Sequence, residues 1–138
     1  MARRYFALIL GVFYTLIAVL GLLGIESAPP AGAPDLSLDT GYGLIFGLFP
    51  TNILHDLVHL VIGLWGIYAY TGVRRATVYA RTVAIIFAIL TIMGLIPALR
   101  TTFGLIPLYG ADVWLHAITA ILAAYFGWIA PYDREALT

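Results

Sequence analysis

Four long apolar stretches dominate this sequence and restrict what it can fold into. They run from about 5 to 25, 52 to 70, 79 to 99 and 112 to 131. A helix of about 20 residues crosses the ~30 Å hydrocarbon core of a bilayer. The stretches lack the polar–apolar alternation of membrane β-barrel strands. The sequence therefore predicts an all-α protein with four transmembrane helices.

Composition supports a membrane protein and excludes several soluble classes. Of the 138 residues, 62% are hydrophobic and 10% are charged, whereas soluble domains average about 25% charged residues. So little polar surface excludes a soluble enzyme, a nucleic-acid-binding protein and a disordered chain. With no cysteine, disulfides and thiolate metal sites are also excluded. We expect a single integral membrane domain spanning residues 1–138, with an irregular exoplasmic loop over residues 26–51.

The sequence also contains an internal repeat. Asn52-Ile53-Leu54-His55 aligns with Val113-Trp114-Leu115-His116, and the offset (116 − 55 = 61) also places Gly66 on Gly127. Each half would hold two helices, so the halves are expected to form a parallel repeat of two helical hairpins. Small residues on one side of the first and third helices should form the packing faces of a four-helix bundle. These residues are Ala7, Gly11, Thr15 and Ala18 in the first helix, and Ala80, Ala84, Ala88 and Thr91 in the third.

The arginines predict the orientation. Six lie in the N-terminus, in the predicted cytoplasmic loop 71–81 or in the C-terminal tail: Arg3, Arg4, Arg74, Arg75, Arg81 and Arg134. Only Arg100 lies on the opposite side. Because cytoplasmic loops are enriched in basic residues, both termini should be cytoplasmic. We expect a multi-pass protein of a bacterial inner membrane or a photosynthetic membrane.

Polar residues gather near the exoplasmic ends of the second and fourth helices. Helical spacing allows His55, His59 and His116 to face one another, with Asp56 and Asp112 nearby. Ionisable residues at membrane depth normally face the bundle interior. In a structural role, Asn52 (or Thr51) and Asp112 would be N-caps, and the histidines would hydrogen-bond across the bundle. Asn52, Asp56 and Asp112 are then polar packing residues.

Three other roles are open for this cluster. His55, His59 and His116 could bind a zinc-like metal with an open fourth position. His55 and His116 could instead bind haem or chlorophyll between helices. A proton or ion path is a weaker hypothesis, since the inner halves of the helices lack ionisable residues.

No known catalytic arrangement is found in the sequence. His55-Asp56-x-x-His59 lacks the glutamate of the zinc-hydrolase helix motif, and no nucleophile elbow or phosphate-binding glycine loop is present. We therefore expect a protein that is not an enzyme.

At these motifs the chain resembles a bacterial membrane family catalogued as domain of unknown function 4383. The resemblance runs from Tyr5 to Ala130 and rests on Asn52-Ile53-Leu54-His55, on Gly63 and Gly66, and on Asp112-Val113-Trp114-Leu115-His116. It implies a four-helix membrane protein and singles out His55 and His116, but it implies no activity. His59 lies outside the family motif.

Taken together, these features predict a small structural or accessory subunit of a membrane assembly. Its partners would be the lipid bilayer and either further copies of the chain or a larger membrane protein complex, and no nucleic acid. The alternative is a binding protein that holds haem, chlorophyll or a metal through His55 and His116.

Overall fold

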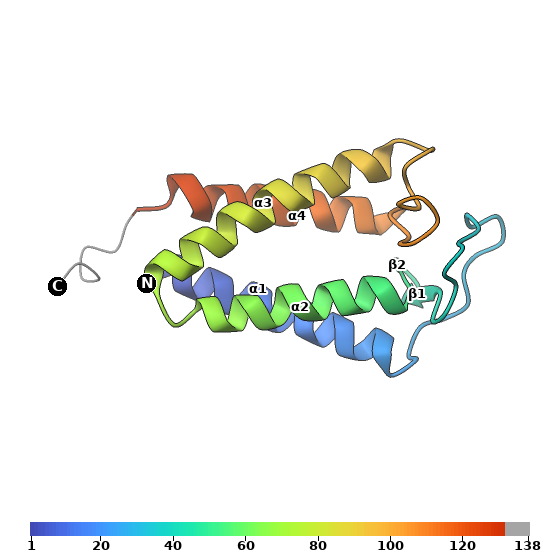
Figure 1. Ribbon diagram of the computed structural model, residues 1–138, viewed down its shortest axis with the longest axis horizontal. Helices are drawn as coiled ribbons and strands as arrows, with labels where there is room; N and C mark the ends of the chain where they lie inside the picture. Colours follow the sequence, from blue (N-terminus) through green and yellow to red (C-terminus); the bar gives the residue numbers. More distant parts are fainter. Residues whose placement is uncertain (132–138) are drawn as a thin grey trace.

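The computed structural model describes residues 1–131 and is mostly helical. Its four helices are α1 (Ala2–Leu22), α2 (Ile53–Ala69), α3 (Val73–Leu95) and α4 (Ala111–Ala124), and α4 continues as the π-helical turn η1 (Tyr125–Ile129) (Figure 1). Three are long and apolar enough to cross a membrane, namely α1, α3 and α4 with η1. With 17 residues, α2 is shorter, about 25 Å. Arg134 of the predicted cytoplasmic tail lies outside the described residues.

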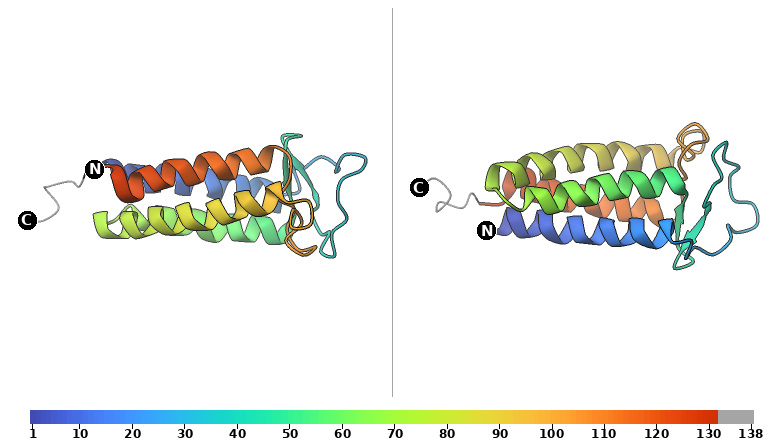
Figure 2. Two further views of the ribbon diagram at one scale, coloured as in Figure 1. Left: turned by 90° about the horizontal axis from the view of Figure 1, so that it is seen from above. Right: turned by 60° about the horizontal axis from the view of Figure 1, so that its bottom comes forward.

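The helices pack as two hairpins. α1 packs most closely on α2, and α3 on α4, and the axes of all four run roughly alongside one another (Figures 1 and 2). The N-terminus lies at one end of the bundle, here called the terminal end, and the long loops lie at the other, the loop end (Figure 2). The division into two helical hairpins agrees with the predicted repeat.

Close backbone contact joins α1 to α2. A Cβ atom on Gly11 would lie 2.6–2.8 Å from backbone atoms of Ile67, Gly63 and Gly66. Of the predicted packing residues, Ala7, Ala18, Ala80 and Ala84 are buried, whereas Ala88 is exposed. The predicted small-residue face is therefore confirmed in α1 and only in part in α3.

The predicted ends of α1 were wrong by three residues at each end. The helix starts at Ala2, so that Arg3 and Arg4 lie within it. It stops before Gly24, whose φ is +69°. The amide of Gly24 donates to the Gly21 carbonyl, and that of Ile25 to the Leu20 carbonyl. This is the Schellman pattern, in which glycine reverses the chain after a helix.

The predicted bounds of the third helix were also wrong. The third helix was expected to begin at about residue 79, but α3 begins at Val73 and so includes Arg74 and Arg75. It ends at Leu95, because Ile96 precedes a proline and adopts an extended backbone (φ −94°, ψ 114°). Residues 96–99 therefore belong to the loop that leads into α4.

The predicted irregular loop 26–51 contains a short sheet. β1 (Gly43–Ile45) and β2 (Phe49–Thr51) pair antiparallel, with Gly43 opposite Thr51, and Ser27 forms a bridge to Leu44. Phe46 and Gly47 turn the chain with φ of 54° and 68°. The all-α prediction therefore holds for the bundle and not for this loop.

Two tyrosines connect the loops at this end. The Tyr42 hydroxyl donates to the Pro34 carbonyl (3.0 Å), so Tyr109 donates to Tyr42 (2.9 Å). Burial raises the pKa of the Tyr109 phenol, so this phenol stays protonated and can donate its hydrogen bond at physiological pH.

Candidate functional site

Three histidines meet inside the bundle near the loop end. His55 and His59 are one turn apart on α2, which places them on the same face of the helix. His116 reaches them from α4. One ring nitrogen from each lies within 4.8 Å of those of the other two. The side chains are 3%, 3% and 0% exposed, respectively, so the bundle shields all three from its surroundings.

Asp112 completes the cluster, and Asp56 does not. One carboxylate oxygen of Asp112 lies 3.6 Å from Nδ1 of His116 and 4.0 Å from Nε2 of His55. Asp56 is turned toward α1, where its carboxylate packs against Gly21 and accepts a hydrogen bond from the Thr51 hydroxyl. The expectation that both carboxylates lie beside the histidines was correct for Asp112 alone.

Asp112 is also not the predicted helix cap. α4 begins at Ala111, its N-cap is Gly110 with φ +63°, and no side chain caps it. The carboxyl group of Asp112 therefore projects from the first turn into the bundle, where it faces two imidazoles. Asn52 does cap α2 as predicted, because its side-chain oxygen accepts from the His55 amide at 3.0 Å.

The histidines do not form the predicted hydrogen bonds across the bundle. Five buried ring nitrogens have no hydrogen-bond partner among residues 1–131. They are Nδ1 of His55, and both nitrogens of His59 and of His116. Leaving a buried polar atom unpaired generally costs about 1–3 kcal/mol. Five such atoms in one place are a poor arrangement for packing alone, and they are the donor atoms that a metal ion would use.

Aromatic rings from α1 and α3 pack against the imidazoles. The Tyr14 ring lies 4.9 Å from that of His59, and the Phe87 ring lies 4.8 Å from that of His116 in an edge-on arrangement. The Tyr14 hydroxyl is hydrogen-bonded to Thr119 on α4 (2.8 Å). Tyr14 and Phe87 were not identified from the sequence, since an aromatic residue in an apolar helix carries no distinctive signal.

A small chamber adjoins the histidines. Its volume is about 150 Å³, and its walls come from α2, α3, α4 and the loop before α4. An engineered apolar cavity of about this volume holds a benzene molecule, and a haem or chlorophyll macrocycle is several times larger. The described residues therefore do not fit a macrocycle between His55 and His116, whose ring centroids are 5.9 Å apart.

The loop end is closed by Asn52. Its side-chain nitrogen donates to the carbonyls of Leu38 (2.8 Å) and Leu105 (2.7 Å), which belong to two different loops. The side chain is completely buried. Asn52 thus holds both loops against the start of α2, directly beside His55.

The terminal end is closed by Arg3, whose role was not predicted. Its guanidinium donates to the Thr77 hydroxyl (3.1 Å) and to the carbonyls of Gly127 and Ala130, and the side chain is 2% exposed. Arg81 also donates to the Gly127 carbonyl (2.8 Å). In the sequence these arginines indicated only orientation, whereas in the structure they bind carbonyls at the end of η1.

Comparison with known proteins identifies a family. No curated protein and no solved structure matches this chain. The family described as domain of unknown function (DUF4383) matches residues 4–129, which include all three histidines, Asp112 and the helices that carry them. This chain therefore belongs to the DUF4383 family.

Proposed function

We propose that this is a small multi-pass membrane protein that binds a divalent transition metal ion through His55, His59 and His116. The observation that carries the proposal is the meeting of three buried imidazoles, five of whose six ring nitrogens have no hydrogen-bond partner among the described residues. Neutral imidazole is a good ligand for zinc and its neighbours. The proposed role is binding, and catalysis is not part of it.

The geometry is close to that of a three-histidine zinc site. At Zn–N distances of about 2.0–2.1 Å, tetrahedral ligand nitrogens lie about 3.3 Å apart. The nitrogens lie up to 4.8 Å apart, so the imidazoles would have to move together by up to about 1.5 Å to hold an ion. Histidines that ligate metals commonly donate their second nitrogen to a carboxylate. Asp112 is placed for that role toward His116, and for charge compensation of the ion.

The test is metal binding by the protein purified in mild detergent. We expect about one zinc or cobalt ion per chain, detected by elemental analysis and by the visible spectrum of tetrahedral Co²⁺. His59→Ala should abolish stoichiometric binding, and Asp112→Asn should weaken it by about 10–100-fold. His116→Asn provides a second ligand variant that keeps a polar side chain.

A buried histidine variant that failed to fold would also lose metal. Helicity by circular dichroism and a monodisperse gel-filtration profile are therefore required of each variant. Wild-type protein that is folded and free of metal after incubation with excess zinc and cobalt would refute the proposal. So would a folded His59→Ala variant that binds Co²⁺ with the same spectrum and affinity as the wild type.

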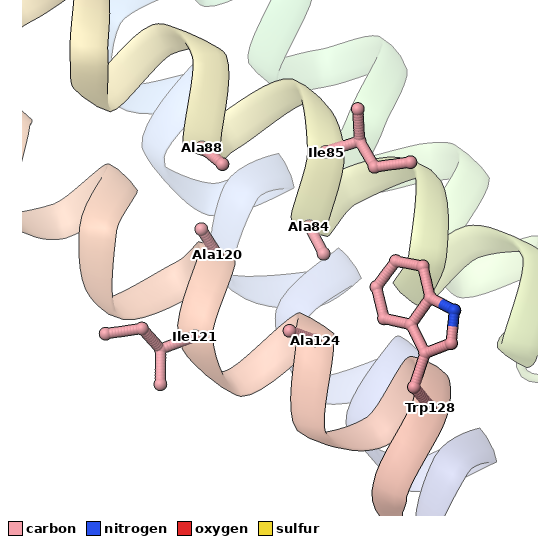
Figure 3. Close-up of a pocket in the computed structure, with 7 residues that line it drawn as sticks. All are labelled: Ala84, Ile85, Ala88, Ala120, Ile121, Ala124 and Trp128. Carbon is pink, nitrogen blue, oxygen red and sulfur yellow. The ribbon is translucent and has the colours of Figure 1, made fainter.

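We propose, as a second and compatible role, that the protein is an accessory subunit of a membrane assembly. A shallow groove between α3 and α4 supports this role (Figure 3). Ala84, Ala88, Ala120 and Ala124 line it, and Trp128 stands at one end. Small residues allow another helix to approach closely in a bilayer. Ala120→Leu should weaken association in cross-linking of native membranes, while Leu122→Ala on the exposed face of α4 should not.

A further inference from the structure

A second cavity, an apolar groove, lies next to the histidine chamber on the side that would face the bilayer. A groove of about 390 Å³ lies between α2 and α3 and is lined entirely by apolar residues. Three side chains line both the groove and the chamber: Val58 and Ile62 from α2, and Ile86 from α3. These three residues, here called the partition, are all that is common to the two spaces. A path from this groove to the histidines therefore runs through them.

The helices on either side of the partition are loosely joined. α2 and α3 are consecutive in the chain, yet they contact each other far less than α1 contacts α2 or α3 contacts α4. The side chain of Ile86 is 38% exposed. The two ends of the bundle are closed instead, by Asn52 with the loops and by Arg3. The seam between α2 and α3 is thus a loosely packed part of the wall around the chamber.

The wall of the chamber is mostly apolar and includes the three histidine side chains. His55, His59 and His116 line one side, and the rest is formed by residues such as Phe87, Leu90 and Leu108. The histidines are at least 97% buried and carry unpaired nitrogens. Ligand pockets typically have this composition, with a few polar groups on an apolar surface. Three histidines leave a fourth position open on a tetrahedral ion.

We propose that a neutral molecule dissolved in the bilayer enters between α2 and α3 and ligates the metal at this open position. The chamber limits its head to about the size of one six-membered ring with a nitrogen or oxygen donor. The apolar groove outside the partition holds its hydrocarbon tail. Charged, water-soluble molecules are excluded, because the route contains no polar side chain. This inference rests on the proposed metal site.

The test uses the cobalt-loaded protein in lipid nanodiscs and two probes that share one ligating atom. 4-Hexylpyridine partitions into the bilayer, whereas pyridine-3-sulfonate remains in water. We expect 4-hexylpyridine to shift the visible Co²⁺ spectrum at a concentration at least 10-fold below that of pyridine-3-sulfonate. An equal effect of both probes, or no effect of either, would overturn the proposal.

Two adjacent residues of α3 provide the matched variants. Ile86→Phe enlarges the partition, while Ile85→Phe makes the same change at a residue that is 53% exposed and faces the α3–α4 groove. We expect Ile86→Phe to raise the half-saturating concentration of 4-hexylpyridine at least 10-fold, and Ile85→Phe to leave it unchanged. Equal effects of the two variants would contradict entry between α2 and α3.

The two proposals fail in different ways. If the wild-type protein binds no Co²⁺, the proposed metal function itself is wrong. If it binds one Co²⁺ per chain but the lipophilic probe leaves the spectrum unchanged, the metal site stands and the membrane-dissolved ligand does not. Unchanged Co²⁺ affinity in Ile86→Phe shows that this variant is folded.

Discussion

Two kinds of buried polar residue lie close together at the loop end: one has all its hydrogen bonds formed, and the other has almost none. Asn52 uses its oxygen and its nitrogen in three bonds, to the His55 amide and to the carbonyls of Leu38 and Leu105. His59, two turns further along α2, has none among the described residues. Satisfied polar groups specify a structure, whereas unsatisfied ones lower stability unless a ligand pairs with them. This contrast separates the structural role of Asn52 from the binding role proposed for the histidines.

Replacing Asn52 should therefore reduce the stability of the fold and leave metal binding by the histidines unchanged. Asn52→Ala leaves one buried amide and two carbonyls without partners, so we expect the free energy of unfolding to fall by about 2 kcal/mol or more. Unfolding in mixed micelles of mild detergent and SDS, followed by circular dichroism, measures this change. Ser37→Ala, in the same loop but on an exposed side chain, serves as the control and should change stability by less than about 0.5 kcal/mol. Equal stability of the two variants would show that Asn52 does not hold the loops.

At the scale of helices, the sequence predicted which segments are helical better than where they end. Apolar length and the lack of alternation were sufficient to identify α1 to α4. The ends depended on details that hydropathy does not contain. Charged residues were assigned to loops, but Arg3 lies within α1, and its guanidinium binds carbonyls at the end of η1. Gly24 ends α1 because its backbone is left-handed. Its neighbours are apolar, so hydropathy alone does not mark this position as the end of the helix.

The candidate site shows the same limit. Spacing of i and i+4 on α2, together with the repeat, was enough to bring His55, His59 and His116 onto facing helices. The direction of each carboxylate was not predictable, because it depends on where the helix begins: α4 starts one residue before Asp112 and lacks a side-chain cap. The missing partners of the imidazole nitrogens are a property of the packed bundle and have no counterpart in the sequence.

The hydrogen bonds that Arg3 donates at the terminal end lead to a second prediction. Arg3 joins α1 to Thr77 on α3 and to two carbonyls at the end of η1. Arg3→Gln should lower the free energy of unfolding by about 1.5–3 kcal/mol, the usual value for hydrogen bonds to a charged group. Arg3→Lys should recover little of it, because an ammonium group lacks the planar fork of donors. Unfolding in mixed micelles measures both.

Arg74→Gln is the control for this prediction. Arg74 is exposed on α3, and its replacement removes the same charge from the same end of the bundle. We expect a change below about 0.5 kcal/mol. Amide exchange near Ala130 should accelerate in Arg3→Gln and not in Arg74→Gln. Equal losses in the two variants would mean that net charge, and not the carbonyl bonds of Arg3, stabilises the terminal end.

For the whole molecule, the two closed ends and the loose seam between α2 and α3 form one arrangement. Asn52 holds the loops at one end, Arg3 holds the helix termini at the other, and the histidine chamber lies between them, nearer the loop end. α2 is shorter than the three segments that are long enough to cross a membrane, and it carries two of the three histidines. If the protein spans the bilayer as proposed, the chamber lies below one membrane surface and is reached more easily from the lipid than from water.

That arrangement makes the orientation of the protein a testable quantity. The arginines predict that the terminal end is cytoplasmic, and the chain has no cysteine, so single cysteines can be introduced without background. Phe103→Cys lies in the loop before α4, where the side chain is 77% exposed, and Thr71→Cys lies at the exposed turn between α2 and α3. In intact cells, a membrane-impermeant maleimide should label the cysteine at position 103. The cysteine at position 71 should be labelled only after the cells are permeabilised. The reverse pattern would place the histidine chamber on the cytoplasmic side, and labelling of both sites in intact cells would contradict a protein that spans the membrane in one orientation.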